Sequence, residues 1–122
     1  MATTTFGRPA ALGATQTTET AAGSTAIAVK TSSATLYTVE IDNTANSVNS
    51  FVKLYDIASG GTTVGTNSPD VVLKAQASKK VTYHFSQGIA FGTALTLACV
   101  TAGGTGGTTA PSSSVGVKFV YD

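Results

Sequence analysis

The side chains that could do chemistry are few and widely spaced in this sequence. The chain of 122 residues has one histidine, one cysteine and six acidic residues. His84 lies in the run VTYHFSQG, whose alternate residues Val81, Tyr83 and Phe85 are expected to face a core and so turn His84 outward. A catalytic histidine needs an acid or a nucleophile beside it, and no sequence neighbour supplies one, although an acid distant in the sequence could fold next to it. We interpret His84 as a surface or interface residue.

Cys99 has no second cysteine with which to form an internal disulfide. In the run ALTLACV it shares one face of an alternating strand with Leu95 and Leu97. A reactive thiol needs an electropositive and partly exposed site, and no charged residue lies near it in the sequence. We therefore expect Cys99 to be a small buried hydrophobic residue.

The acidic residues offer two further hypotheses. Asp42, Asp56 and Asp70 could meet at one end of a β-sandwich and bind calcium, but such a site needs about six or more oxygen ligands. Glu40 and Asp42 could form the carboxylate pair of a glycosidase, but Glu40 has an expected partner in Lys53. The sequence therefore predicts that the protein is not an enzyme and holds no metal or cofactor.

Composition and charge exclude several classes of partner. Charged residues make up 11% of the chain, the net charge is +1, and only Lys79 and Lys80 are adjacent basic residues. Nucleic-acid binding usually needs a basic stripe, and a membrane span needs a longer apolar run than any present here. The first residues also lack the apolar segment of a secretory signal. We expect no nucleic-acid, membrane or small-molecule partner, and synthesis in a cytoplasm.

About seven short segments carry the alternation of a half-buried strand, and no segment carries a helical period. They are STAIAVKT, TLYTVEIDN, SFVKLYDI, DVVLKA, KKVTYHF, TALTLACVT and SVGVKFVY. The sequence predicts an all-β fold, with a single β-sandwich of jelly-roll or Ig-like type over residues 23–122. The expected core consists of Ile27, Val29, Val39, Ile41, Val52, Leu54, Val72, Val81, Tyr83, Phe85, Leu95, Leu97, Val115, Val117 and Phe119.

Two details of this sandwich are predicted from residue spacing. A hairpin of residues 36–43 with 50–57 would place Ile41 opposite Val52 and Glu40 opposite Lys53, although a connection of this length could also cross between sheets. The loops Gly60–Pro69 and Gly103–Pro111 share a Gly-Gly-Thr start and a proline end. We expect the two loops at equivalent ends of the sandwich.

Residues 1–22 show no sustained strand or helix period, so we interpret them as an extended N-terminal arm that runs along a neighbouring subunit. Two groups of residues are candidates for contacts with partner proteins. The first group is the large side chains of the arm, and the second is aromatic rings expected at strand edges. The arm supplies Phe6, Arg8, Pro9 and Leu12, and the sandwich supplies Tyr37, Tyr55, Phe91 and Tyr121. The four rings of the sandwich could also form a sugar-stacking surface, and we favour the protein interface.

Four runs resemble small structural proteins of tailed bacteriophages, including phages of cyanobacteria, over about residues 36–122. They are YTVEIDNTANSVNSFVKLYD, SPDVVL, KKVTYHFSQGIAFGTALTLACVTAGG and TTAPSSSVGVKFVYD. The resemblance implies a β-sandwich component of the virion, assembled in the host bacterial cytoplasm.

Within the virion we consider two roles. In the first, the protein is a capsid decoration or cement protein that contacts the major capsid protein and copies of itself. In the second, it belongs to a tail, baseplate or fibre and touches the host surface. A small lectin-like protein is a third possibility from another class.

Overall fold

The computed structural model describes the backbone of residues 3–7 and the whole of residues 14–122. The elements within these residues are β1 (Thr3–Gly7), β2 (Thr15–Ala22), β3 (Ile27–Lys30), β4 (Ala34–Asp42), β5 (Ser50–Tyr55), the short 3-10 helix η1 (Ser59–Gly61), β6 (Val71–Ala75), β7 (Lys80–Phe91), β8 (Leu95–Val100) and β9 (Val115–Tyr121). The seven predicted strands correspond to β3–β9, and β1 and β2 are additional.

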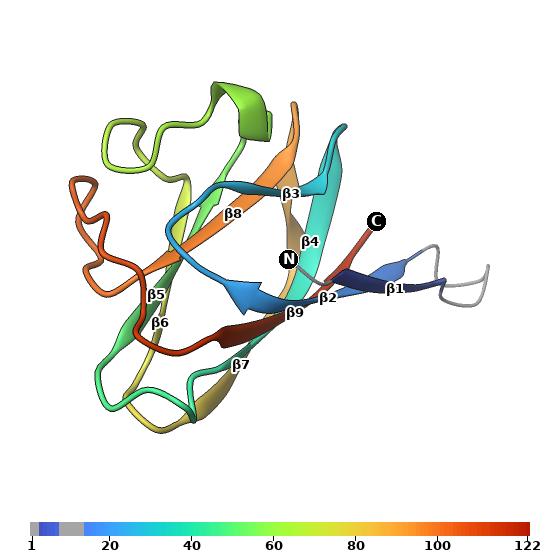
Figure 1. Ribbon diagram of the computed structural model, residues 1–122. Coiled ribbons are helices and arrows are strands. Elements are labelled where there is room, and N and C mark those ends of the chain that lie inside the picture. The colour runs from blue at the N-terminus through green and yellow to red at the C-terminus, as the bar shows by residue number, and fades with distance from the viewer. Residues whose placement is uncertain (1–2, 8–13) are drawn as a thin grey trace.

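The strands form two facing antiparallel sheets, which confirms the predicted all-β sandwich (Figure 1). The five-stranded sheet has the order β1-β2-β9-β4-β7, and the four-stranded sheet has the order β3-β8-β5-β6. From β2 to β9 the chain changes sheet at every connection except β5–β6. This strand order is that of an eight-stranded jelly roll rather than an Ig-like sandwich, with β1 added at one edge.

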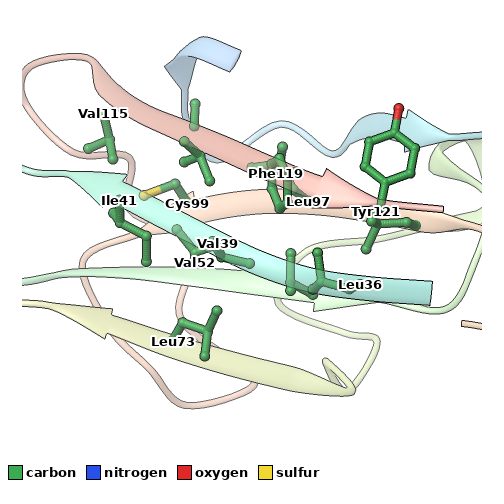
Figure 2. Close-up of a cluster of buried hydrophobic side chains, with 14 of the residues drawn as sticks. Leu36, Val39, Ile41, Val52, Leu73, Leu97, Cys99, Val115, Phe119 and Tyr121 are labelled. Atoms are coloured by element: carbon green, nitrogen blue, oxygen red, sulfur yellow. The ribbon is translucent and has the colours of Figure 1, made fainter. Parts of the chain in front are cut away.

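The core lies between the sheets, and most of it was predicted from alternation (Figure 2). The predicted residues of β4, β5, β8 and β9 are all fully buried, and those of β3 and β7 are partly buried against them. Val72 is the exception, because it is 40% exposed while its neighbour Leu73 is buried. The core also contains Leu36, Leu73, Phe91, Cys99 and Tyr121.

The predicted hairpin between residues 36–43 and 50–57 is wrong, because β4 and β5 belong to different sheets. The connection crosses from one sheet to the other, which was the alternative. Val52 and Ile41 therefore belong to one core cluster but to opposite sheets, rather than to neighbouring strands of one ladder (Figure 2). Glu40 lies opposite Lys118 of β9 instead of Lys53.

The boundary of the predicted N-terminal arm is also wrong over Thr15–Ala22. This segment is β2, which pairs with β1 on one side and with β9 on the other. Ala22 is 3% exposed and belongs to the core, and Thr17 and Glu19 on the same inward face are buried. The sandwich domain therefore includes residues that the sequence assigned to the arm.

The expectation that the two glycine-rich loops lie at equivalent ends of the sandwich is wrong. The loops follow β5 and β8, which are antiparallel, so they leave the four-stranded sheet at opposite ends and meet over its outer face (Figure 1). Gly65 of the first loop adopts φ +94, and a Cβ at this position would lie 2.4 Å from the Thr108 methyl carbon of the second loop. Only glycine fits both the backbone conformation and this close approach. Gly65 thus allows the two loops to pack together.

Candidate interaction surface

The outer face of the five-stranded sheet is broad and polar. The strand register places Thr18, Lys118, Glu40 and Thr82 in one row across β2, β9, β4 and β7. A shallow hollow of about 400 Å³ lies over this face, lined mainly by threonines and charged side chains. Such a surface offers hydrogen-bonding groups to a partner, and short threonine side chains lose little conformational freedom when they are covered.

Charges at one end of this face are arranged around Asp42. Its carboxylate accepts hydrogen bonds from the Thr44 hydroxyl at 2.5 Å and from the Thr44 backbone N–H at 3.1 Å. These bonds, with a smaller contribution from Lys80, lower the pKa of Asp42. Asp42 is therefore a turn-stabilising residue that stays ionised, rather than a proton donor.

His84 points outward from β7, as predicted, and is exposed. Its Nδ1 lies 3.3 Å from the Thr38 hydroxyl, at hydrogen-bond distance. A threonine hydroxyl does not activate a histidine as an acid does, and no acidic group is hydrogen-bonded to His84 among the described residues. This pair can contribute to a polar contact surface, and it lacks the third group that a catalytic arrangement needs.

Loops cover the outer face of the four-stranded sheet over its central strands β5 and β8, whereas Val72 of the edge strand β6 stays exposed. Lys53 of β5 points to this side, is fully buried, and donates hydrogen bonds to the carbonyl oxygens of Gly104 at 2.6 Å and Gly107 at 3.0 Å. Burial lowers the pKa of the Lys53 ammonium. The sequence did not indicate this role, because strand alternation assumes that the outer face meets water.

Three of the four aromatic candidates from the sandwich are not exposed. Tyr55, Phe91 and Tyr121 are 0%, 1% and 7% exposed, so their rings are part of the protein interior. Tyr121 Oη lies 2.9 Å from the Thr17 hydroxyl oxygen. Tyr37 is partly buried, and its ring packs beside Gly88. The expectation that exposed rings form a binding surface is therefore wrong for all but Tyr37.

The four candidates from the arm can be located only in part. Phe6 lies in β1, where its backbone pairs with Gln16 of β2. Arg8, Pro9 and Leu12 lie outside the described residues, so their assignment as partner-binding residues stays a prediction. Within the described part of the chain, β1 pairs only with β2, and its opposite edge is the margin of the sheet.

The structure does not bring the three aspartates of the calcium hypothesis together. Asp70 accepts a hydrogen bond from the Asp56 backbone N–H at 2.7 Å, whereas Asp42 is bonded to Thr44. The Asp56 carboxylate accepts the backbone N–H groups of Gly92 and Thr93. Across residues 14–122 there is no group of three or more histidine, cysteine or acidic side chains that could hold a metal ion.

Cys99 is fully buried in β8, as predicted, and burial raises the pKa of its thiol to about 12. A thiol in this state is a poor nucleophile.

No helix in the described residues is long and apolar enough to cross a membrane. Sequence comparisons match the chain to no family model and to no curated protein. The candidate surface is therefore interpreted from its geometry and from the sequence.

Proposed function

We propose that this chain is a structural protein of a tailed-phage particle, and that it acts as a capsid decoration or cement protein. In this role it bridges major capsid subunits and contacts copies of itself, and it needs no catalytic group, metal or cofactor. The proposal starts from the resemblance of residues 36–122 to phage structural proteins. The jelly-roll topology supports it by analogy, because viral capsid domains share this architecture with lectins and cupins.

The observation that carries the proposal is the extra edge strand β1. It extends the jelly roll by one strand and contributes an edge with no neighbour among the described residues. An unpaired strand edge offers backbone N–H and C=O groups to a partner strand independently of side-chain type. Such main-chain pairing suits a protein that attaches repeatedly to identical subunits.

The polar outer face of the same sheet supports this role. It is continuous with β1 through β2, so a subunit that pairs with β1 could also cover the row of threonine and charged residues. Each such contact is weak, but many copies attached to one shell, each through two surfaces, reinforce one another by effective concentration. Contact area, rather than one deep pocket, would provide the affinity.

The test is the copy number of the chain in purified particles of a phage that encodes it, measured by quantitative mass spectrometry against the major capsid protein. A cement protein is expected at a copy number comparable to that of the major capsid protein. A copy number far below it would assign the chain to the tail or baseplate and overturn the cement role. Its absence from mature particles would overturn the proposal as a whole.

A further inference from the structure

A groove at one side of the sandwich is lined by three lysines. It runs between the edge strands of the two sheets, β6 and β7, and has a volume of about 320 Å³. Its lining consists of Lys74, Gln76, Lys79, Lys80, Val81 and Tyr83. None of these residues is acidic, although Lys80 also interacts with Asp42 on the outer face of the sheet. The groove is therefore positively charged, with an apolar contribution from Val81 and Tyr83.

One wall of the groove is partly closed by a hydrogen bond between the two sheets. The Tyr83 hydroxyl of β7 donates to the Lys74 carbonyl oxygen of β6 at 2.5 Å. This bond satisfies a carbonyl that the β6 edge would otherwise offer to solvent. It also fixes the Tyr83 ring between the sheets. The β6 edge is thus less available for strand pairing than the β7 edge.

Among the described strands, only β4 pairs with β7, so the other edge of β7 presents open backbone groups beside the lysines. The Asn43 backbone N–H donates to the Lys79 carbonyl, which identifies this position as a hydrogen-bonded pair of the β4–β7 ladder. Hydrogen-bonded and non-hydrogen-bonded pairs alternate along an antiparallel ladder. Lys80, Thr82 and His84 therefore direct their backbone N–H and C=O groups away from β4, toward the open edge.

An irregularity in β7 limits the length of this open edge. Thr38 pairs with His84 but Leu36 pairs with Ile89, so four residues of β7 lie opposite the single residue Tyr37. Within this bulge Gly88 adopts φ +76, where a Cβ would lie 2.4 Å from the Thr35 methyl carbon. Bulges interrupt strand pairing. The bulge thus divides the edge into Lys80–His84, which lies next to the groove, and the shorter Ile89–Phe91 beyond it.

We propose that this edge and groove bind a short, acidic, extended segment of a partner protein by strand addition to β7. Backbone pairing with Lys80–His84 provides the register, and the lysines of the groove select carboxylate side chains on the incoming strand. This inference concerns a different edge from β1 and does not depend on the proposed phage function.

A peptide strand fits this site better than a nucleic acid does. Single-stranded nucleic acid is usually bound by exposed aromatic rings on which bases stack, along a continuous basic track. The one aromatic ring of the groove, Tyr83, is partly buried and held by its hydrogen bond to Lys74. The open main-chain groups of β7, by contrast, match a peptide backbone.

The experiment measures binding of a short fluorescent peptide that alternates glutamate with valine to the full chain. A peptide with glutamine in place of glutamate is the matched ligand control. We expect the acidic peptide to bind at least about tenfold more tightly than the glutamine peptide, with an affinity that falls as salt rises. Bound peptide should also slow hydrogen exchange of the Lys80, Thr82 and His84 amides.

Two variants separate the parts of the site. The triple variant Lys74→Gln/Lys79→Gln/Lys80→Gln should weaken acidic-peptide binding at least about tenfold, whereas Lys118→Gln, outside the groove, should change it less than about twofold. Thr82→Pro removes an edge-facing N–H without removing a bond to β4, and should abolish the slowed exchange. Unfolding temperatures of all variants serve as the folding control.

The proposal is overturned by any of three results. These are acidic-peptide binding that the triple variant leaves unchanged, binding without slowed exchange along β7 in the native chain, and tighter binding of single-stranded DNA or a sulfated oligosaccharide than of the acidic peptide. The native-chain exchange measurement decides the matter even if Thr82→Pro fails to fold.

Discussion

The Lys53 ammonium lies 2.6 Å from the Gly104 carbonyl oxygen and joins β5 to a loop 51 residues further along the chain. The same ammonium donates to the Gly107 carbonyl at 3.0 Å. Gly107 in turn donates its backbone N–H to the Gly104 carbonyl at 3.0 Å. A single buried lysine thus holds the glycine-rich loop against the four-stranded sheet.

Replacing this lysine tests its role in loop packing. We expect Lys53→Met to lower the free energy of unfolding by about 1–3 kcal/mol, because the Gly104 and Gly107 carbonyl groups lose a charged hydrogen-bond donor. Hydrogen exchange of the loop at residues 101–110 should become faster. Lys118→Met on the polar outer face is the matched control and should change stability by less than about 0.5 kcal/mol. Equal stability of Lys53→Met and the native chain would contradict this assignment.

Tyr55 tests the opposite case, a buried polar atom without a partner. Its hydroxyl is the one buried side-chain polar atom in residues 14–122 that makes no hydrogen bond, and burial raises the pKa of the phenol. Removing such a hydroxyl leaves no other group unpaired. We expect Tyr55→Phe to unfold at the same denaturant concentration as the native chain or at a higher one. A loss of more than about 1 kcal/mol in chemical denaturation would show that the hydroxyl has a partner.

The register of β6 is tested by a pair of truncations. Leu54 is fully buried, whereas Val72 is 40% exposed. Leu54→Ala should lower the free energy of unfolding by about 2–5 kcal/mol, through lost burial and a residual cavity. Val72→Ala should lower it by less than about 0.5 kcal/mol. Chemical denaturation of both variants measures the difference. A large decrease in the free energy of unfolding for Val72→Ala would show that Val72 is a core residue.

These two positions show how far the sequence predicts the fold. Alternation identified Leu54 and the core positions of β9, because a lysine, Lys53 or Lys118, marks the opposite face of each strand. In DVVLKA it fits two registers, and only the structure shows that Val71, Leu73 and Ala75 face inward. The sequence does hold one signal for the observed register: the alternative, with Val72 facing the core, would also turn Lys74 toward the core.

The sheet arrangement and the covered faces could not be predicted in the same way. A segment such as TQTTETAA has no apolar period, but it forms β2, which pairs with β9 and buries Thr17, Glu19 and Ala22. Alternation predicts that Lys53 and Tyr55 of β5 face solvent, but loops cover them in the folded protein and both are fully buried. The contacts that decide these features join residues far apart in sequence.

Acid stability should depend on Asp56. Hydrogen bonds from the backbone N–H groups of Thr93, Gly92 and Ala94, with that of Thr93 the largest contribution, hold the pKa of Asp56 below its ordinary value of 3.8, although burial opposes them. A lowered folded-state pKa means that the stabilisation is present above the unfolded value and is lost as pH falls through the folded value.

We therefore expect the free energy of unfolding to decrease more steeply with acidification below about pH 4 in the native chain than in Asp56→Asn. Denaturation curves between about pH 6 and pH 2 measure this slope. Asp122→Asn, at an exposed position, is the matched control and should keep the native slope. Identical slopes for Asp56→Asn and the native chain would contradict the assignment.

The most direct test of the proposed role is rebinding of the purified chain to phage particles that lack it, with and without residues 1–13. This truncation removes β1 but leaves β2, Thr15–Ala22, in the sheet, whereas removal of residues 1–22 would also remove buried Ala22. We expect the full chain to bind saturably, and the shortened chain to keep its unfolding temperature and bind at least about tenfold more weakly. Equal binding of the two chains, or no binding of the full chain, would contradict the claim that it attaches to the particle through its N-terminal edge strand.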